Sequence, residues 1–285
     1  SQLFDTVYFE IRTKCNSQCS FCAASIQNET RPDITMDFNL YKKAIDELST
    51  LRFDGTIAFH VNSEPLLVKN IEEYISYARN KVPNSWIQIL SNGKSLNSNN
   101  GKKIIEAGIN ELSLNIYNDN LDSKLPKNIK KFEDEVLNKY FNKNQIYSGH
   151  RDKALKGKFI KYNKYKRLLT EVLSNRGGTA PNKKSNEKLK QKYGFCEFPF
   201  LQLNITADGR VGQCCSDLYF DNVMGNIKFE SLTEIWSGNK FNDLRNRLLL
   251  NDRSNLICDK CDYYGISRPP KNVMRKMMYY LFKHN

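Results

Sequence analysis

Three cysteines near the start of the chain have the spacing of a metal-binding loop. Cys15, Cys19 and Cys22 form the pattern Cys-x3-Cys-x2-Cys. Three thiolates are soft ligands that suit an iron–sulfur cluster. A [4Fe–4S] cluster needs four ligands, so this loop would leave one iron open to a substrate or cofactor, as catalytic zinc sites keep one open position. Zinc with a distant fourth ligand is the simpler alternative, although zinc motifs more often use Cys-x2-Cys pairs.

The other five cysteines lie far downstream. Cys196, Cys214, Cys258 and Cys261 form a second possible four-thiolate set, and Cys215 is left over. The Cys-x2-Cys pair within the set suits either zinc or iron. Eight cysteines could also form four disulfides, but the N-terminus shows no secretory signal pattern. Because the cysteines fall into two groups with none between them, we predict metal sites rather than disulfides.

Predicted strands and helices alternate in the first part of the chain and position these residues. Strands are expected at 7–11, 56–61, 86–90 and 111–117, and helices at 37–51, 70–79 and 102–108. This alternation predicts an α/β fold with a parallel sheet, a partial (β/α)6 TIM-type barrel with a small C-terminal domain. Working groups in such barrels lie at the carboxyl ends of strands. The cysteine trio, Glu64 and Asn92 all follow predicted strands directly.

The alternation is lost in a basic insertion, residues 118–166. The whole chain has a formal net charge of +13. Between residues 118 and 170 there are fourteen Lys or Arg against six Asp or Glu. Residues 121–140 have a helical pattern. Such a stretch either binds phosphate, nucleic acid or another anionic surface, or is a solvated lysine-rich face.

The chain is expected to divide near residue 181. A last barrel strand is predicted at 167–173, and a lysine-rich linker at 182–192 leads to the C-terminal cysteines. We therefore expect a barrel domain in residues 1–181 and a cluster domain in residues 182–285.

Composition excludes some classes of protein. No apolar run reaches the roughly 18 residues that a membrane span needs, so no membrane partner is expected. With no targeting signal visible, a cytoplasmic protein is expected. A nucleic-acid partner is not expected either, because no aromatic-and-basic RNA-binding motif is visible.

The N-terminal motif resembles that of the radical S-adenosylmethionine superfamily. An aromatic residue precedes the last cysteine in that family, and Phe21 stands at this position. The resemblance implies that the open iron of a [4Fe–4S] cluster binds S-adenosylmethionine, which is cleaved to a 5′-deoxyadenosyl radical that abstracts hydrogen from the substrate. It also implies an external electron donor of the flavodoxin or ferredoxin type.

Two further segments resemble cofactor-binding motifs of the same family. The Gly-Gly-Glu-Pro motif is matched in part by Asn62, Ser63 and Glu64 before a proline, with both glycines replaced. The resemblance implies that this segment contacts the methionyl amine, with Glu64 as a charged partner. The alternative for Glu64 is an acid favoured by a helix N-terminus. Asn92, in Ser91-Asn92-Gly93, resembles the Asn of a Thr-Asn-Gly turn and is assigned to cofactor contact.

The C-terminal cysteine pattern resembles the SPASM and twitch extensions of these enzymes. Gly209, in Ala207-Asp208-Gly209-Arg210, would make the turn of their opening hairpin. No cysteine follows Cys261, and the resemblance is therefore to the shorter twitch form. It implies one auxiliary [4Fe–4S] cluster held by Cys196, Cys214, Cys258 and Cys261. A structural zinc module is the alternative.

Size, cysteine spacing and the segment Asn175-Arg176-Gly177-Gly178 resemble the aminocyclitol and sugar dehydrogenases of this group. The resemblance implies an oxidoreductase that oxidises a secondary alcohol of a small polar substrate, with or without a phosphate or nucleotide group, and passes an electron to the auxiliary cluster. Arg176 would orient the hydroxyl; an exposed surface arginine is the alternative. An epimerase that uses Cys215 as hydrogen donor stays open, as does modification of a peptide. The short segment before Cys15 leaves no room for a leader-peptide domain and disfavours the latter.

Overall fold

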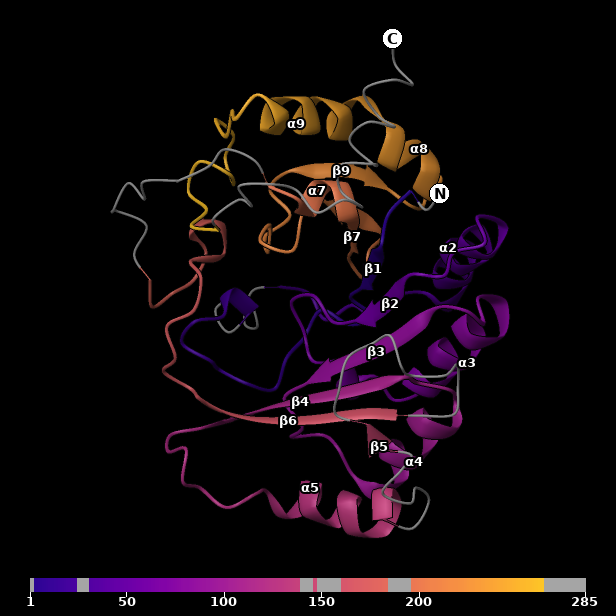
Figure 1. Ribbon diagram of the computed structural model, residues 1–285, viewed down its shortest axis with the longest axis vertical. Coiled ribbons are helices and arrows are strands. Elements are labelled where there is room, and N and C mark those ends of the chain that lie inside the picture. The colour runs from indigo at the N-terminus through magenta and orange to yellow at the C-terminus, as the bar shows by residue number, and fades with distance from the viewer. Residues whose placement is uncertain (1–2, 25–30, 139–145, 148–159, 184–195, 264–285) are drawn as a thin grey trace.

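The computed structural model describes residues 3–24, 31–138, 146–147, 160–183 and 196–263. Most of the predicted linker at 182–192 lies outside these residues, as does much of the basic insertion. The described strands form one sheet in the order β5-β6-β4-β3-β2-β1-β7-β8-β9 (Figure 1). Their bounds are β1 Thr6–Phe9, β2 Thr56–Phe59, β3 Trp86–Ser91, β4 Glu111–Asn118, β5 Ile146–Tyr147, β6 Ile160–Leu168, β7 Gln202–Ile205, β8 Arg210–Gly212 and β9 Val223–Asn226.

The first four strands and β6 are parallel neighbours, as a partial barrel requires. The connecting helices are α2 (Phe38–Thr50), α3 (Ile71–Lys81), α4 (Ser98–Glu106) and α5 (Lys127–Phe132). Figure 1 shows α2, α3 and α4 along one side of the sheet. The predicted α/β fold with a partial barrel is confirmed. No helix in the described part of the chain is both long and apolar enough to cross a membrane.

Local sequence accounts for the helix boundaries. Asp37 caps α2 by accepting a hydrogen bond from the Leu40 backbone N–H at 2.9 Å, an interaction that contributes about 1 kcal/mol. The predicted apolar face of α2 is buried. Helix α4 begins four residues before its predicted start, because Asn97 and Asn100 form a reciprocal capping box. The polar first turn of α4 carries no apolar pattern that would have shown this.

The basic insertion contains a strand that the sequence did not indicate. Strand β6 pairs with β4 along its whole length from Glu111↔Lys161 to Asn118↔Leu168. The predicted strand at 167–173 is therefore wrong: it lies about seven residues too late. Charged residues alternate with tyrosines in β6, so it lacks the apolar run of a buried strand.

The predicted helix at 121–140 is shorter than expected. Helix α5 starts after Pro126, which stands at its N-cap, and a π-helical turn, Glu133–Leu137, continues it. Proline favours helix starts, because its φ is fixed and it lacks an N–H donor. Ile129 and Phe132 are buried and hold this segment against the barrel.

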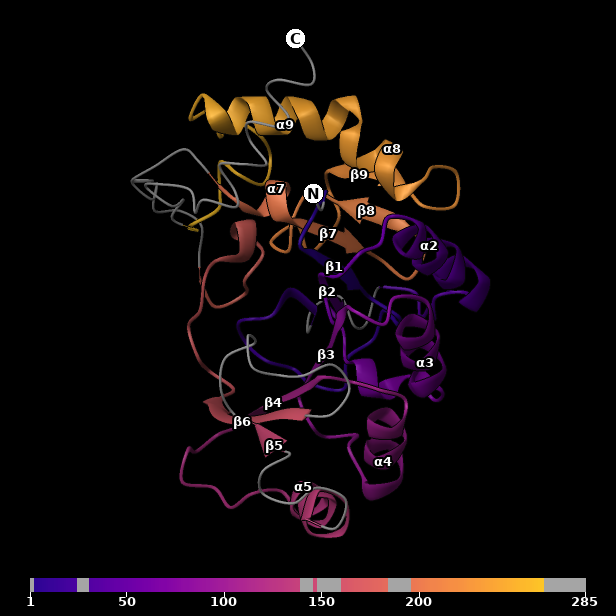
Figure 2. The same ribbon diagram turned by 45° about the vertical axis from the view of Figure 1, so that its right-hand side comes forward.

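The C-terminal region continues the same sheet. Strand β7 pairs in parallel with β1, and β8 and β9 follow in antiparallel order. Gly209 makes the predicted hairpin turn with a φ of 87°. Helices α7 (Phe198–Leu201), α8 (Leu232–Ser237) and α9 (Asn239–Leu249) cover this end of the molecule (Figure 2). Because the sheet is continuous from β1 to β7, the division at residues 181 and 182 stays a prediction.

Buried polar contacts fasten this end to the barrel. The Glu47 carboxylate of α2 accepts hydrogen bonds from the backbone N–H groups of Leu232 and Thr233, at 2.8 and 3.0 Å, and so caps α8. Arg245 is almost fully buried, donates to the Pro199 carbonyl at 2.9 Å and stacks on Trp236 at 4.1 Å.

Candidate active site

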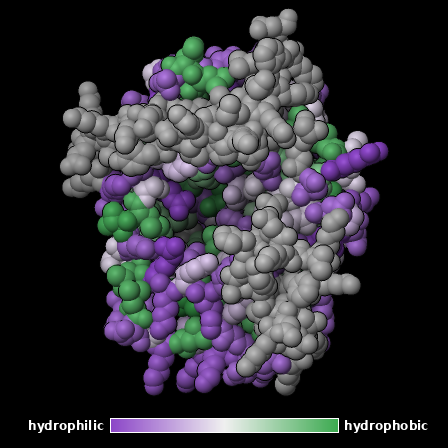
Figure 3. Space-filling view, viewed as in Figure 1, coloured by the Kyte–Doolittle hydropathy of each residue, from purple (hydrophilic) through white to green (hydrophobic). Residues whose placement is uncertain are grey.

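The N-terminal cysteine trio lies where the parallel strands end. The loop after β1 brings all three thiols to a cavity of about 120 Å³. Residues after β2 and β3 and from the end of β4 share this cavity, as predicted for the carboxyl edge of a barrel. Six of its lining residues are Cys15, Cys19, Cys22, His60, Asn92 and Tyr117. Figure 3 shows the same face as Figure 1, hollowed near its centre, with hydrophobic side chains at the base of the hollow.

The loop that carries the trio is fixed to the rest of the barrel. Ser20 donates from its backbone N–H and its hydroxyl to the Leu169 carbonyl, at 3.2 and 2.9 Å. The ring of Phe21 is buried and lies 5.3 Å from the ring of Tyr117 at the end of β4. Phe21, predicted to contact the cofactor, thus forms a wall between the cysteine loop and β4.

The thiols of the trio have the chemistry that a cluster needs. None is in a disulfide. Burial, together with charge on neighbouring groups, raises the pKa of Cys15 to about 11 and that of Cys19 to about 12. Positive metal ions would offset both effects, because they bind thiolates. Among the described residues no three His, Cys, Asp or Glu side chains are close enough to share a single ion. Cluster ligands need not be, since several metal atoms lie between them.

Glu64 links the ends of β2 and β3. One carboxylate oxygen accepts hydrogen bonds from the Ser91 hydroxyl at 2.7 Å and from the Leu66 N–H at 3.0 Å. The other oxygen accepts from the Asn92 N–H at 2.7 Å. Burial raises the pKa of Glu64, and these bonds oppose the rise. Glu64 also caps the 3₁₀ turn Pro65–Leu67, which is the helix-terminal role considered as an alternative.

Two asparagines extend this network toward the cysteines. The Asn92 side-chain amide donates to the Asn16 side-chain oxygen at 2.8 Å and to the Cys15 sulfur at 3.7 Å. Asn62 donates to the Leu218 carbonyl at 3.0 Å and so connects the β2 end to the C-terminal region. Ser63 also lines the cavity. The predicted cofactor-binding residues are thus together, and their contact with the cofactor stays a prediction.

The four C-terminal cysteines form a second buried group. All four thiols are buried and unbridged. Burial raises the pKa of Cys196 to about 12, and the charges of Cys258 and Cys261 act in the same direction. Burial also raises the pKa of Cys214, and the charges of Cys215, Cys196 and Cys258 act in the same direction. Four mutually interacting thiols fit a fully protein-ligated cluster or a zinc ion equally in number.

Hydrogen bonds reach the sulfurs of this second group. The Gln213 side-chain amide donates to the Cys258 sulfur at 3.5 Å, and the Ser216 N–H donates to the Cys214 sulfur at 3.4 Å. The Asn255 side-chain oxygen accepts from the Cys258 N–H at 2.7 Å. Hydrogen bonds to ligand sulfurs are one means by which proteins set the potential of an iron–sulfur cluster.

The Arg176 segment has a strained backbone. Arg176 has a φ of 49°, in the left-handed region that costs a non-glycine residue about 1–2 kcal/mol. Gly177 and Gly178 follow with φ of 63° and 85°. Asn175 and Asp262 hold the segment by reciprocal hydrogen bonds of 2.9 and 3.0 Å between backbone N–H groups and side-chain oxygens. Because Asp262 follows Cys261, the strained segment is anchored to the second cysteine group.

The charge of Arg176 reaches groups from both halves of the site. Burial lowers the pKa of His60, and the charge of Arg176 is the second influence and lowers it further. Burial raises the pKa of Cys215, and the charge of Arg176 is again the second influence but lowers that pKa. On Tyr117, whose pKa burial raises, the charge of Arg176 is the smallest of the influences, after those of Cys19, Arg167 and Cys22. Arg176 therefore lies close enough to His60 and Cys215 for its charge to act on the pKa of both. Burial still raises the pKa of Cys215 to about 11, so its thiol stays protonated at neutral pH.

Sequence reasoning missed His60 and Asn204. The buried Nδ1 atom of His60 has no hydrogen-bond partner among the described residues, and its ring meets that of Tyr8 edge to face at 5.2 Å. Asn204 of β7 is opposite Tyr8 and fully buried, and neither polar atom of its side chain has a partner in the described part of the chain. Such atoms mark places where a polar ligand or water belongs. The available signal was a histidine directly after a barrel strand.

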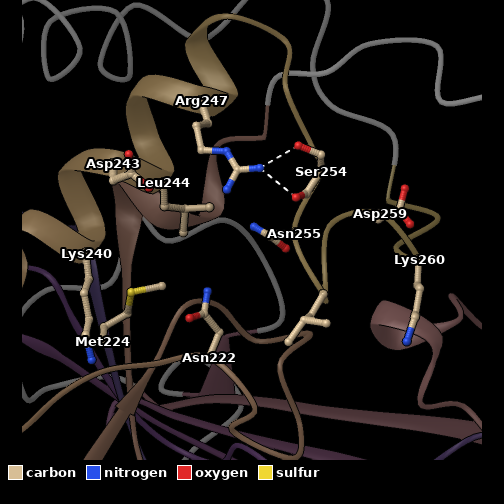
Figure 4. Close-up of a pocket in the computed structure, with 11 residues that line it drawn as sticks. Asn222, Met224, Lys240, Asp243, Leu244, Arg247, Ser254, Asn255, Asp259 and Lys260 are labelled. Carbon is tan, nitrogen blue, oxygen red and sulfur yellow. Dashed lines mark hydrogen bonds between the residues drawn. The ribbon is translucent and has the colours of Figure 1, made fainter.

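A larger recess of about 640 Å³ lies elsewhere, on the C-terminal region (Figure 4). Arg247 donates there to the carbonyl and hydroxyl of Ser254, at 2.7 and 2.6 Å. Lys240 donates to the Val223 carbonyl at 2.8 Å. Asn255 shares this wall and bonds to the Cys258 N–H, so the recess lies behind the second cysteine loop. None of the predicted site residues lines it.

Comparisons with known proteins agree with this geometry. Residues 196–262 match the SPASM family, described as an iron–sulfur cluster-binding domain. The chain is 28% identical over 266 residues to the S-adenosyl-L-methionine-dependent 2-deoxy-scyllo-inosamine dehydrogenase of Niallia circulans, covering 93% of this chain and 95% of that protein.

Solved structures show the same likeness. BtrN in complex with AdoMet and 2-DOIA has a TM-score of 0.70 and 25% identity, and the match covers 95% of this chain and 98% of that one. BtrN in an open conformation has a TM-score of 0.62 and 23% identity over 92% and 94% of the two chains. anSMEcpe with bound AdoMet, at 14% identity and a TM-score of 0.54 over 98% and 93% of the chains, shares the fold.

Proposed function

We propose that this chain, a radical S-adenosylmethionine oxidoreductase with a SPASM-type iron–sulfur domain, oxidises a secondary alcohol of an aminocyclitol or a related sugar to a ketone. The cofactors of such an enzyme are [4Fe–4S] clusters and S-adenosylmethionine. The likeness to a named dehydrogenase covers 93% of the chain. The proposal thus includes a role for the C-terminal group and for a small-molecule substrate.

The observation that carries the proposal is the place of Arg176. Its strained backbone is anchored beside Cys261, and its charge acts on His60 and Tyr117 at the cavity of the trio. A strained residue that the surrounding structure holds in place favours a functional role. These observations support a role for Arg176 between the place where hydrogen would be removed and the group that would accept an electron.

Each group of side chains then has a part in the reaction. Cys15, Cys19 and Cys22 would hold the first cluster, and the four C-terminal cysteines the auxiliary one. When bound at the first cluster, S-adenosylmethionine would supply the radical chemistry for hydrogen abstraction, and the auxiliary cluster would supply one-electron redox chemistry. Arg176 donates hydrogen bonds to the hydroxyl oxygen and orients the carbinol. The walls formed by Phe21 and Tyr117 exclude water from the reacting atoms.

The polar interior of the barrel favours a hydroxylated substrate without a phosphate. His60 and Asn204 leave buried polar atoms without partners in the described residues, as a ligand rich in hydroxyl and amino groups would require. The lysines of β6 in the basic insertion are already engaged. Lys161 pairs with Glu111 at 3.3 Å, Lys164 with Glu133 at 2.6 Å, and Lys166 donates to two backbone carbonyls.

Epimerisation through Cys215 is the second candidate. The protonated thiol near Arg176 favours it, because a neutral thiol is what a hydrogen-atom donor must be. Product analysis in deuterium oxide separates the two reactions: a ketone indicates dehydrogenation, and solvent deuterium on the carbinol carbon indicates epimerisation. Normal turnover by Cys215→Ala would exclude the epimerase.

Two further parts of the proposal concern the setting of the enzyme. A flavodoxin- or ferredoxin-type protein in the cytoplasm would supply the electron that starts each turnover. The barrel of residues 1–181 would hold the cofactor, and the domain of residues 182–285 would hold the auxiliary cluster. Activity with a purified flavodoxin and its reductase, compared with a chemical reductant, tests the choice of donor.

The central experiment is oxidation of 2-deoxy-scyllo-inosamine by the anaerobically reconstituted protein. Arg176→Gln should lower ketone formation about 100-fold while S-adenosylmethionine is still cleaved, the size of effect seen when one aimed donor is removed. Arg210→Gln is the control, because Arg210 pairs with Asp208 at 2.8 Å on the surface hairpin and should have no effect. Wild-type protein that cleaves S-adenosylmethionine but forms no ketone from aminocyclitols or sugars would refute the proposal.

A further inference from the structure

His60 has a position that the proposed reaction does not yet explain. It follows β2 at the carboxyl edge of the sheet and lines the cavity that contains the cysteine trio. Its Nδ1 atom is shielded from solvent and lacks a hydrogen-bond partner among the described residues. A buried polar atom without a partner costs about 1–3 kcal/mol, so its presence beside a cavity calls for a ligand group.

The surroundings of His60 keep its imidazole neutral. Burial lowers the pKa of His60 to about 4, and the positive charge of Arg176 acts in the same direction. Tyr8 of β1 packs its ring against that of His60, and burial raises the pKa of Tyr8 to about 12. A neutral imidazole has one nitrogen with a free lone pair, which can accept a proton.

From this geometry we propose that His60 is the proton acceptor of the reaction, taking the proton of the carbinol hydroxyl at Nδ1. The inference rests on the proposed function and names a residue for a step that this function leaves unassigned. Arg176 cannot take that proton, because a guanidinium is already fully protonated. Arg176 and His60 then divide the work, with the first orienting the hydroxyl oxygen and the second removing its proton.

The step balances with the groups already named. The alcohol loses a hydrogen atom from carbon, a proton from oxygen and one electron, and becomes a ketone. The hydrogen atom goes to the 5′-deoxyadenosyl radical, which becomes 5′-deoxyadenosine. The proton goes to His60 Nδ1, and the auxiliary cluster would take the electron. A weak base is sufficient, because the hydroxyl becomes a strong acid as the carbon loses its electron. The bound proton then leaves to water when the product departs.

The test compares His60→Asn and His60→Gln with wild type in the reconstituted holoenzyme. A substrate with deuterium on the carbinol carbon reports hydrogen abstraction as deuterium in 5′-deoxyadenosine, and ketone is measured separately. An amide can hydrogen-bond to the hydroxyl but cannot accept its proton. Deuterium transfer should therefore continue, while ketone per 5′-deoxyadenosine falls about 100-fold, within the range for loss of a general base. Electron paramagnetic resonance should show an organic radical that accumulates in both variants.

A second arm separates proton acceptance from a structural role. His60→Ala leaves space for a small ring, and added imidazole should restore ketone formation. Pyrazole has nearly the same size and is a far weaker base, so it should not. Rescue by both rings or by neither would overturn the proposal, since it would indicate packing rather than base catalysis. Equal ketone yields for wild type, His60→Asn and His60→Gln would overturn it too.

The same data distinguish this inference from the function on which it rests. If wild-type protein forms no ketone from any carbinol offered, the proposed oxidation fails, and the role of His60 fails with it. If wild type oxidises the substrate and the His60 variants do so equally well, only the role of His60 fails. A tenfold or larger loss of ketone in His60→Asn with unchanged deuterium transfer supports both.

Discussion

The two cysteine groups of this protein present the same kind of atom, a thiol sulfur, in opposite settings. The N-terminal trio lines a cavity, and two of its three residues, Cys15 and Cys22, are only partly buried. All four C-terminal cysteines are buried, and hydrogen bonds from Gln213 and Ser216 reach two of the sulfurs. Three ligands beside a cavity would leave one iron open to bind a cofactor, whereas four ligands would complete the coordination of a cluster and suit it to electron transfer.

The largest expected difference comes from removing one ligand of each group. Cys19→Ala should abolish cleavage of S-adenosylmethionine, because the first cluster would lose one of its three protein ligands. Cys196→Ala should retain cleavage and lose ketone formation. Iron should fall from about eight to about four per chain in each variant. Equal loss of cleavage in both variants would mean that the two groups do not have separate roles. Zinc in place of iron would show that the groups do not hold iron–sulfur clusters.

The anchoring of the Arg176 segment to the second cysteine group should be sensitive to Gly177. A Cβ added there would lie 2.9 Å from the Ile257 side chain and 3.0 Å from the Ser216 carbonyl, at a φ of 63°. We expect Gly177→Ala to lower the free energy of unfolding by about 2 kcal/mol and to reduce ketone yield, since it displaces Arg176. Urea unfolding and product analysis measure the two effects. If Gly177→Ala has the stability and ketone yield of wild type, this segment does not hold Arg176 in place.

Glu64 should matter to the N-terminal site alone. In Glu64→Gln the amide group that replaces one oxygen would face a backbone N–H or a hydroxyl donor, at a cost of about 1–2 kcal/mol. Because Asn92 shifts with it, the affinity for S-adenosylmethionine should also fall, as equilibrium dialysis would show. Glu47→Gln, at the α8 cap, is the matched control and should lower stability without changing that affinity. A similar affinity loss in both variants would contradict the assignment.

The smallest expected effect is on the pH dependence of stability. Folding lowers the pKa of His60 from 6.5 to about 4. At pH values between these two, the unfolded chain therefore binds more protons than the folded one. Stability therefore falls as the pH falls through the unfolded pKa. From about pH 7.5 to about pH 5.5, wild type should lose about 1 kcal/mol more than His60→Gln in urea unfolding. Parallel curves for the two proteins would show that His60 is not held neutral.

The sequence predicts the N-terminal site well because of a general property of parallel sheets. Cys15, Glu64 and Asn92 each follow a strand, and parallel strands end at one edge, so their proximity follows from the alternation alone. The second group was predicted from its resemblance to known extensions, and residues 196–262 match such a domain.

Other features depend on contacts that no local pattern encodes. Strand β7 pairs with β1 from about two hundred residues away, which places Asn204 opposite Tyr8. The left-handed backbone of Arg176 is imposed by the Asn175–Asp262 bonds, and only the glycines that follow hint at it. Strand β6 was misplaced because its lysines and tyrosines lack the apolar run expected of a barrel strand.

Electron paramagnetic resonance of proteins that retain one cluster each tests the division of tasks most directly. A Cys196→Ala/Cys258→Ala protein would keep the first cluster, and a Cys15→Ala/Cys19→Ala protein the second. Adding S-adenosylmethionine to the reduced proteins should change the signal of the first and leave that of the second unchanged. A change in the second signal, or none in the first, would contradict the assignment of the open iron to the N-terminal loop.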